Sequence, residues 1–409
     1  MSLDMRPITQ DEFPDYLRAL EIAFGSSIPD EDIEAERATF EADRSLAVFD
    51  RDRIVGTAGA YSFRLTVPGA LEIPVAGVTM VSVLPTHRRS GILRQMMQRQ
   101  LDDVQSRGES MAVLLASESV IYGRFGYGLA TTNLGLTIER PYNSFTRPIE
   151  TPGQCTLMPA SEAITVLPEI YERVRLLQPG AINRSPEWWE QYMRDPERHR
   201  DGLSPRFYVT YQNTAGMVDG YVTYRVKNDW GPGGPNNTLV VFEFITATSE
   251  ARSALWQYCM NVDLIRTVEA RSCPVDEPLR WMLADPRRLH VTRYSDWLWA
   301  RLLDIPTALS ARRYSTNGDI VFQVVDHFRP QNDGCYSLAG GPDGAECTPT
   351  RQSPDLALHV SDLGAAYLGG VSFCTLARAG RVSELTPRAL RRADALFTWD
   401  PAPWCAMFF

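Results

Sequence analysis

The chain has 409 residues, a length that fits two to three ordinary domains. Its 41 Lys and Arg residues against 50 Asp and Glu residues give a formal net charge of −9, so the surface as a whole repels nucleic-acid phosphates and anionic lipids and suits cationic small molecules. Hydrophobic residues make up 44% of the chain and charged residues 22%, which excludes a disordered or fibrous protein.

Three further features predict a cytoplasmic protein. No apolar run approaches the roughly 18 residues needed to span a bilayer, and MAVLLA at 111–116 is typical of the longest runs. The N-terminal segment MSLDMRPITQDEFPDY is acidic and lacks the apolar stretch of a signal peptide, so we expect no secretion leader. The seven cysteines are scattered without a C-x-x-C pair, which is typical of reduced thiols and not of a disulfide framework or a zinc site.

The first third of the chain alternates strand and helix patterns. The turn 50–53 predicts a hairpin, and Pro85 ends a later strand because it has no N–H to donate to a ladder. From 91 to 107 the apolar residues follow the period of an amphipathic helix, with Gly108 as its stop. The segment SESVIYGRFGYG then predicts a short helix broken at Gly126. The expected strands are 45–49, 54–67, 75–84 and 111–116.

The remaining two thirds also mix strands and helices. Ser185-Pro186-Glu187 predicts a helix start, because it offers a hydroxyl cap, a proline in the first turn and an acid beside it. A composition change near 304 indicates a third unit, in which Gly340-Gly341 predicts a turn. The other expected elements are strands at 207–211, 220–226, 239–245, 319–325 and 355–360 and helices at 251–266 and 388–397.

The most informative stretch is VTMVSVLPTHRRSGILR at 78–94, which reads as a strand, a turn, a glycine and a helix start. A helix start presents unpaired N–H groups and a partial positive charge, so it binds anions. Gly91 lets a ligand approach the backbone, and Arg88 and Arg89 add positive charge. We expect a diphosphate site without a Walker or Rossmann motif. The alternative is an ordinary solvated Arg-Arg turn.

This stretch resembles a known family. Arg88-x-x-Gly91-x-Leu93 is similar to the acetyl-CoA motif of GCN5-related N-acetyltransferases (GNATs), Gln/Arg-x-x-Gly-x-Gly/Ala, and departs from it at Leu93. More narrowly, VLPTHRRSGILRQMM and LLASESVIYGRFGYGLATT resemble the enhanced intracellular survival (Eis) acetyltransferases. The resemblance continues through ALWQYCM, WLWARLLDIPTALSARRY, ECTPT, YLGG and the C-terminal Phe.

The resemblance implies an α+β protein with tandem GNAT folds and a sterol-carrier-protein-like C-terminal domain. We expect a GNAT domain with the acetyl-CoA site at 1–147, a degenerate GNAT domain at 148–297 and the carrier-like domain at 298–409. The family also implies a homo-oligomer, a hexamer, with a small-molecule amine acceptor and neither a nucleic-acid nor a membrane partner. The second domain offers only Gly231-Pro232-Gly233-Gly234-Pro235, whose prolines make a poor phosphate cradle, so we expect it to be catalytically silent.

The resemblance also implies the positions of the cofactor-binding residues. The backbones of Val81 and Val83 are expected to pair with the pantetheine arm of acetyl-CoA, and Ser117 to lie near the cofactor. The expected pyrophosphate cradle is Arg88, Arg89, Ser90, Gly91, Ile92 and Leu93.

Acetyl transfer to an amine needs an acid for the departing thiolate and a base for the charged amine. The resemblance implies Tyr122 as the acid, because it stands where these transferases place a tyrosine facing the sulfur. Its alternative role is core packing, which fits Tyr127 and Phe125 better. For the base, the resemblance implies the terminal carboxylate of Phe409. The tail APWCAMFF is apolar enough to enter a pocket, although the tail alone favours simple packing against the last helix.

The expected substrate pocket contains Ser26, Met80 and Phe408. Phe408 stands where related proteins carry an acid, and Ser26 where another pocket acid is expected, so the pocket is less anionic and amine acetylation in general is better supported than aminoglycoside acetylation. His87 borders the phosphate turn, but no His/Cys/Asp spacing predicts a metal site.

The resulting hypothesis is an acetyl-CoA-dependent N-acetyltransferase that acts on aminoglycoside-like or other polyamine and alkylamine substrates by direct transfer. One alternative is an N-acetyltransferase for lysines of proteins or peptides. The other is a lipid- or sterol-binding protein whose acetyltransferase half is vestigial.

Overall fold

The computed structural model describes residues 3–142, 144–149 and 152–409. It divides into two compact units, one formed by the chain up to Thr131 together with Asp296–Phe409 and the other by Thr132–Ser295. The first unit holds two sheets, and each unit is treated separately below. No helix in the described ranges is long and apolar enough to cross a membrane.

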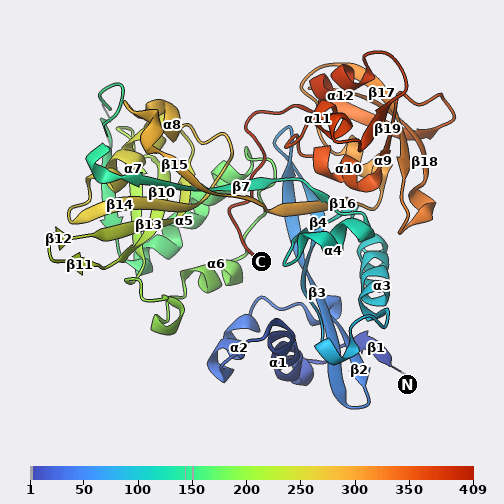
Figure 1. Cartoon of the computed structure of the whole chain (residues 1–409), viewed down its shortest axis with the longest axis horizontal. Coiled ribbons are helices and arrows are strands. Elements are labelled where there is room, and N and C mark those ends of the chain that lie inside the picture. Colours follow the sequence, from blue (N-terminus) through green and yellow to red (C-terminus); the bar gives the residue numbers. More distant parts are fainter. Residues whose placement is uncertain (1–2, 143, 150–151) are drawn as a thin grey trace. The chain divides into compact units, whose positions relative to one another are not determined.

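The N-terminal part of the first unit is a mixed sheet with helices packed on it (Figure 1). Among the described residues this sheet has seven strands in the order β1-β2-β3-β4-β5-β16-β6. The strands are β1 (Asp4–Pro7), β2 (Leu46–Asp50), β3 (Arg53–Val67), β4 (Leu71–Val83), β5 (Met111–Leu115), β6 (Gly128–Leu129) and β16 (Leu298–Leu302). The helices are α1 (Phe13–Phe24), α2 (Asp30–Glu36), α3 (Ile92–Ser106) and α4 (Ser119–Tyr122).

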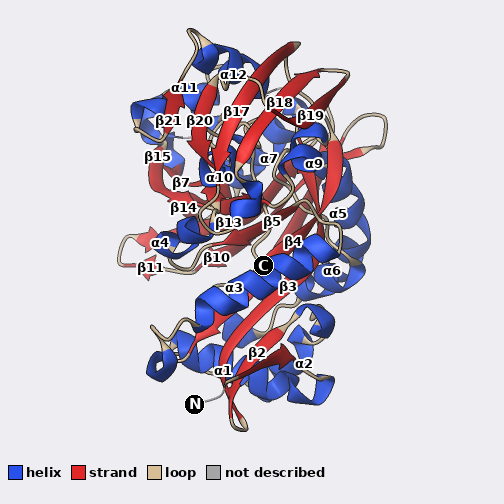
Figure 2. Cartoon of the chain, turned by 90° about the vertical axis from the view of Figure 1, so that its right-hand side faces the viewer, coloured by secondary structure: helices blue, strands red, loops and turns tan. Residues whose placement is uncertain are grey.

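Helix α3 crosses from β4 to β5, the two parallel strands of this sheet, as a parallel pair requires. The apolar stripe expected from the sequence is buried: Met96, Met97, Leu101 and Val104 have almost no exposed surface. Figure 2 shows α3 lying along this face of the sheet. The helix is also tied to the neighbouring strand, because the Gln100 amide donates to the Gly59 carbonyl at 2.6 Å.

Strand β16 joins the first sheet after the chain has passed through the second unit. It pairs antiparallel with β5, with Leu298 opposite Leu115, and also with β6. In exchange, β7 (Thr132–Glu139) belongs to the sheet of the second unit. The units therefore divide at Thr131 and Asp296, whereas the sequence placed boundaries after 147 and 297. The period of a strand does not reveal which sheet it joins.

The second unit is built on a sheet of seven strands, counted over its described residues, in the order β15-β7-β14-β13-β10-β9-β8, with a separate ribbon β11-β12. The further strands are β8 (Gln154–Met158), β9 (Phe207–Gln212), β10 (Val218–Lys227), β11 (Trp230–Gly231), β12 (Gly234–Pro235), β13 (Asn237–Thr246), β14 (Ile265–Cys273) and β15 (His290–Asp296). The helices are α5 (Ala160–Arg175), α6 (Pro186–Met193), α7 (Ser249–Asn261) and α8 (Leu279–Met282).

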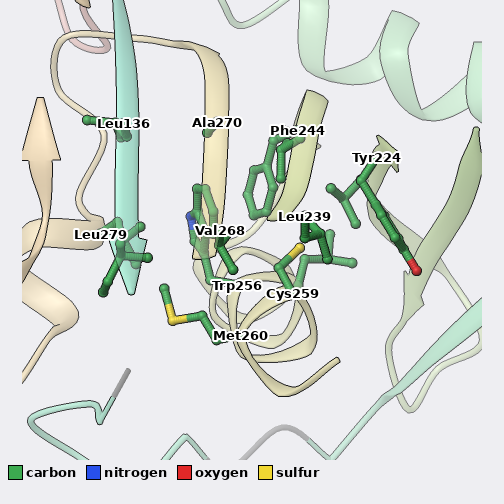
Figure 3. Close-up of a cluster of buried hydrophobic side chains, with 14 of the residues drawn as sticks. Leu136, Tyr224, Leu239, Phe244, Trp256, Cys259, Met260, Val268, Ala270 and Leu279 are labelled. Carbon is green, nitrogen blue, oxygen red and sulfur yellow. The ribbon is translucent and has the colours of Figure 1, made fainter. Parts of the chain in front are cut away.

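Helix α7 fills the core of the second unit (Figure 3). Trp256 stacks on Phe244 of β13 with ring centroids 4.4 Å apart. The sequence predicted a helix over 251–266, but the helix ends at Asn261, because the chain must turn before β14 begins at Ile265. The predicted start at Ser185 is confirmed: its hydroxyl accepts from the Trp188 amide at 3.4 Å.

The C-terminal part of the first unit has its own sheet. Within the described chain its five strands run in the order β19-β18-β17-β20-β21. They are β17 (Gly318–Val325), β18 (Gly334–Gly341), β19 (Gly344–Thr350), β20 (Leu356–His359) and β21 (Val382–Glu384). The helices are α9 (Ile305–Ser310), α10 (Val360–Ala366), α11 (Phe373–Arg378) and α12 (Ala389–Phe397).

The prediction of a turn at Gly340-Gly341 is wrong, because both glycines end strand β18. Their role is close packing. A Cβ on Gly340 would lie 2.6 Å from the Tyr314 ring. A Cβ on Gly341 would lie 1.8 Å from the side-chain oxygen of Asn317. Glycine within a strand often marks a bulge, a tight bend or a site of close approach.

Candidate active site

A cavity of about 910 Å³ opens in the first unit where β4 ends and α3 begins. Its walls come from the end of α1, the end of β4, the first turn of α3 and the segment around α4. The lining residues are Ala23, Phe24, Val81, Ser82, Val83, His87, Arg88, Arg89, Gly91, Ile92, Leu93, Arg94, Ser117, Glu118, Val120, Ile121, Tyr122, Arg124 and Phe125.

One wall of the cavity is the free edge of β4. Strand β4 pairs with β5 over Ala76–Val78 and then continues to Val83. On its other side β4 pairs with β3, with a register shift that gives β4 one extra residue. Met80 lies in this bulge with φ +53°. A bulge bends its strand away from the neighbour, so backbone groups beyond Val78 are open to a ligand.

The bulge is held by a hydroxyl of the neighbouring strand. Thr57, fully buried on β3, donates to the Met80 carbonyl at 2.7 Å. Its oxygen also lies 2.7 Å from the Ser82 hydroxyl. Because the single Thr57 proton goes to Met80, Ser82 is the donor in the second bond. The two bonds fix the strand edge that faces the cavity.

A second wall is the start of α3. Gly91 caps the helix with φ +86°, and Arg89 also has a positive φ of +64°. The backbone amide of Gln95 donates the first hydrogen bond of the helix, to the Gly91 carbonyl at 3.1 Å. The amides of Ile92, Leu93 and Arg94 precede this bond and have no acceptor within the helix. They form, with the helix dipole, a site for an anion.

Arginine side chains surround this helix start. Arg88 is anchored, because its Nε donates to the Val83 carbonyl at 3.2 Å and one terminal nitrogen approaches the Ala23 carbonyl at 3.5 Å. It therefore links the end of β4 to the end of α1. Arg94 and Arg124 also line the cavity, although the sequence analysis did not single them out. Both could have been found, since one lies in the first turn of the predicted helix and the other two residues after Tyr122.

The third wall carries Tyr122, the last residue of α4. Its side chain is 5% exposed and contributes to the cavity. Burial raises the pKa of the Tyr122 phenol; the hydrogen bond with Ser117 lowers it, and the negative charge of Glu118 raises it. The net shift is upward, so the phenol stays protonated and can donate a proton at neutral pH. Tyr127 packs edge-on against it at 6.0 Å and is a core residue, as expected.

The C-terminal tail leaves α12 and reaches the first sheet. The Trp297 indole donates to the Cys405 carbonyl at 2.8 Å, and Cys405 is fully buried. The Phe409 ring then packs against Phe63 of β3 with centroids 5.1 Å apart, and a Cβ on Gly77 of β4 would lie 3.2 Å from that ring. Figure 2 shows this end of the chain beside β3 and β4. The tail therefore does more than finish the packing of α12.

Comparison with known proteins agrees with this architecture. Residues 4–130 and 180–302 each match an acetyltransferase (GNAT) domain, and residues 305–406 match a sterol carrier protein domain. The N-acetyltransferase Eis of Mycobacterium tuberculosis is 32% identical over 410 residues, covering 98% of both chains. The chain belongs to the Eis family of N-acetyltransferases.

Further relatives support this assignment. The crystal structure of Eis1 from Mycobacterium abscessus superimposes with a TM-score of 0.88 at 34% identity, over 99% of this chain and 100% of that one. An uncharacterized N-acetyltransferase of Streptomyces avermitilis is 43% identical over 99% of both chains. The predicted family, the tandem GNAT plus carrier-like α+β fold and the N-acetyltransferase class of enzyme are confirmed.

The structure of this Eis-family enzyme gathers most of the predicted cofactor residues around one cavity. They are Val81, Val83, Arg88, Arg89, Gly91, Ile92, Leu93 and Ser117, and the predicted acid Tyr122 lines the same cavity. Ser90 lies in the same turn, but its hydroxyl donates to the His87 carbonyl at 2.5 Å, and it is outside the described lining.

The predicted substrate-pocket residues and Phe409 do not belong to that lining as far as the chain is described. Ser26 is exposed, and its hydroxyl is bonded to the Glu21 carboxylate. Met80 packs on the apolar cluster beneath α1. Phe408 is 72% exposed and has its ring 6.1 Å from that of Trp297.

The second GNAT domain repeats the strand, helix, strand crossover as β13, α7 and β14. Its helix start carries an acid, Glu250, which accepts a short hydrogen bond from the Tyr211 hydroxyl. The Thr248 hydroxyl accepts from the Ala251 amide at 3.1 Å. A carboxylate and a side-chain cap thus occupy the position where α3 offers free amides and arginines.

Proposed function

We propose that this enzyme binds acetyl-CoA in the α3 cavity and transfers the acetyl group directly to an amine of a small molecule. The observation that carries the proposal is the meeting of three features at one cavity: the free amides that open α3, the arginines around them and the buried side chain of Tyr122. An acyl-CoA offers a diphosphate to the first two and a thiol leaving group to the third.

The residues fit the diphosphate. Gly91 has the backbone conformation that glycine favours. A Cβ there would meet only the side-chain amide nitrogen of Gln95, at 3.8 Å, so the space above the helix start is open. The amides of Ile92 and Leu93 would hold the phosphate oxygens, and Arg88 and Arg89 would add charge. The edge of β4 at Val81 and Val83 offers backbone groups to the pantetheine arm, which carries amides of its own.

The reaction requires two proton transfers. The deprotonated amine attacks the thioester carbon, a C–N bond forms, the C–S bond breaks, and the sulfur leaves with the bonding electron pair. Tyr122 donates its proton to that sulfur. The proton lost by the amine goes to the carboxylate of Phe409, through a water molecule. The docking of the Phe409 ring between Phe63 and Gly77 supports this role, because it fixes the terminus at the sheet.

The acceptor that we propose is a small amine with an apolar portion, in preference to a polycationic sugar. Phe408 presents an exposed aromatic ring and adds no negative charge for a second ammonium group. Aminoglycosides, alkylamines and arylalkylamines share the attacking group and differ in charge and apolar area. These differences make them a suitable series for testing the pocket.

The test is release of free thiol from acetyl-CoA with a panel of arylalkylamines, polyamines, aminoglycosides and lysine peptides. We expect arylalkylamines to give the highest kcat/KM. Turnover of lysine peptides alone would instead favour the protein acetyltransferase. A fatty ligand that raises Tm while acetyl-CoA leaves it unchanged would favour the lipid-binding alternative, because only a ligand of the native state raises Tm.

The role of the terminal carboxylate has a separate test. Removing Phe409, or adding residues after it, separates the terminal carboxylate from the residue whose ring packs on β3 and β4. We expect turnover to be lost while acetyl-CoA binding by calorimetry is retained. Full activity of an enzyme with a C-terminal tag would overturn this role and leave the acetyl-CoA site untouched.

A further inference from the structure

A loop of the carrier-like domain contacts residues that line the cavity. Residues 326–333, here called the 326–333 loop, connect β17 to β18. Asp326 organises the loop, because one of its carboxylate oxygens accepts from the Phe328 and Arg329 amides at 3.2 and 3.0 Å. The other oxygen accepts from Arg301 at 2.5 Å and from Asn332 at 2.9 Å. A carboxylate with every lone pair engaged fixes the path of the loop.

The ion pair at the base of the loop is unusually well buried. The side chains of Arg301 and Asp326 have no exposed surface. Arg301 also lies directly under the turn that follows Tyr122, because a Cβ on Gly126 would come within 2.7 Å of its guanidinium carbon. Breaking such a pair by removing one partner leaves an uncompensated charge. The pair therefore holds the loop and the Tyr122 turn in one arrangement.

Phe328, near the tip of the loop, touches two walls of the cavity. Its ring is 4% exposed and packs edge-on against Phe125 with centroids 5.0 Å apart. The Arg94 guanidinium lies 5.0 Å from the same ring. Phe125 follows Tyr122 on one wall of the cavity, and Arg94 belongs to the first turn of α3 on another. Phe328 also shares an apolar cluster with Tyr122.

Arg329 forms hydrogen bonds with the C-terminal half of α3. Its two terminal nitrogens donate to Asp102 and Gln105, each at 2.6 Å, and its side chain is 3% exposed. Helix α3 is therefore held at both ends from the carrier-like domain, by an aromatic contact at its first turn and by two hydrogen bonds near its end. Both contacts come from neighbouring residues of one fixed loop.

We propose that Phe328 is a positioning residue for the acyl-CoA cavity. It sets the separation between the first turn of α3 and the turn that carries Tyr122, and Arg329 keeps α3 from sliding on the loop. The carrier-like domain thus contributes to acyl-CoA binding through this loop, independently of its C-terminus. The proposal rests on the acetyl-CoA site proposed above.

The test compares Phe328→Leu with Phe322→Leu. Phe322 is a fully buried phenylalanine of β17 in the same domain, and its ring packs on Phe373 and Phe397 within that domain. Both changes remove an aromatic ring from a core, so both lower Tm. We expect only Phe328→Leu to raise the KM and Kd for acetyl-CoA, by roughly tenfold, while the KM for the amine stays within about twofold.

Arg329→Gln provides a second variant. The bond from residue 329 to Asp326 uses the backbone amide, so this change keeps that bond and removes the side-chain contacts to Asp102 and Gln105 together with those to Gln331 in the loop. We expect a rise of about threefold in the KM for acetyl-CoA. This variant decides the question if Phe328→Leu does not fold.

The outcomes separate the two proposals. Unchanged acetyl-CoA binding in both Phe328→Leu and Arg329→Gln overturns the positioning role and leaves the acetyl-CoA site standing. An equal loss in Phe322→Leu also overturns it, because general loosening of the domain would then be sufficient. Absence of acetyl-CoA binding in the unchanged enzyme overturns the proposed function itself.

Discussion

Gly91 illustrates how much of the proposed site depends on the backbone at single residues. Its φ of +86° lies in the region that side chains avoid, and the space around it is open. The sequence predicted a glycine that allows close approach, and the structure agrees. The sequence could not predict that Arg89 also adopts a positive φ, because arginine carries no such signal.

Gly91→Ala tests the helix start against a matched control. Gly108 ends the same helix with φ +78°, and nothing lies within 4 Å of a Cβ there. Each substitution costs roughly 1–2 kcal/mol of folding free energy, because both place a side chain in the left-handed region. We expect only Gly91→Ala to weaken acetyl-CoA binding by calorimetry, by about tenfold or more. An equal effect of Gly108→Ala would assign the loss to general destabilisation.

Thr57 was not singled out in the sequence, since a buried threonine on a strand is ordinary. Thr57→Val keeps the shape of the side chain and leaves the Met80 carbonyl and the Ser82 hydroxyl without their partner. We expect a loss of about 1–3 kcal/mol in unfolding free energy and a higher KM for acetyl-CoA. Thr57→Ser restores the hydroxyl and should restore both. If Thr57→Val binds acetyl-CoA normally, the bulge does not depend on this bond.

Tyr122→Phe tests the proposed acid, with Tyr127→Phe as its control. The Tyr127 hydroxyl makes only a weak contact with the Met97 sulfur at 3.9 Å, so its loss should change little. Loss of a general acid lowers kcat by roughly 10²–10⁴-fold. Both substitutions keep the edge-on ring contact of the tyrosine pair.

The pH dependence follows from the direction of the shift. Burial raises the pKa of Tyr122 above its ordinary value, and an acid must be protonated to act. Activity controlled by Tyr122 is therefore present at neutral pH and is lost only as pH rises above about 10. This alkaline limb should be missing from the residual activity of Tyr122→Phe. A limb that persists there belongs to another group.

Among the elements, those with a strong local signal were predicted well. The apolar period predicted α3, and the capping group at Ser185 predicted the start of α6, because both signals lie within the segment itself. The exchange of β7 and β16 between sheets, and the 326–333 loop, depend on contacts between distant parts of the sequence. No local pattern reports such contacts. The predicted cofactor residues came together because one short segment supplies most of them.

The second helix crossover allows a test at the scale of the element. Thr248→Ala removes the hydroxyl that caps α7, which costs about 1 kcal/mol of folding free energy. If the second GNAT domain is catalytically silent, the Kd for acetyl-CoA and the kcat should both remain unchanged. Calorimetry and thiol release at a temperature well below Tm measure them. A rise in the Kd or a fall in the kcat would give this domain a part in the reaction.

At the scale of the molecule, the carrier-like domain serves the first GNAT domain in two places. Its loop places Phe328 behind the cavity, and its tail places Phe409 on β3 and β4. The charge of the cavity is also opposite in sign to that of the whole chain. The chain carries a net charge of −9, yet the described lining of the cavity includes Arg88, Arg89, Arg94 and Arg124. A local positive site in an acidic protein favours a polyanionic donor together with a cationic acceptor.

The most direct test of the account is a crystal structure of the enzyme grown with acetyl-CoA. The account predicts diphosphate oxygens within hydrogen-bond distance of the Ile92 and Leu93 amides, with the sulfur facing the Tyr122 hydroxyl. A diphosphate bound elsewhere, or a sulfur turned away from Tyr122, would contradict it.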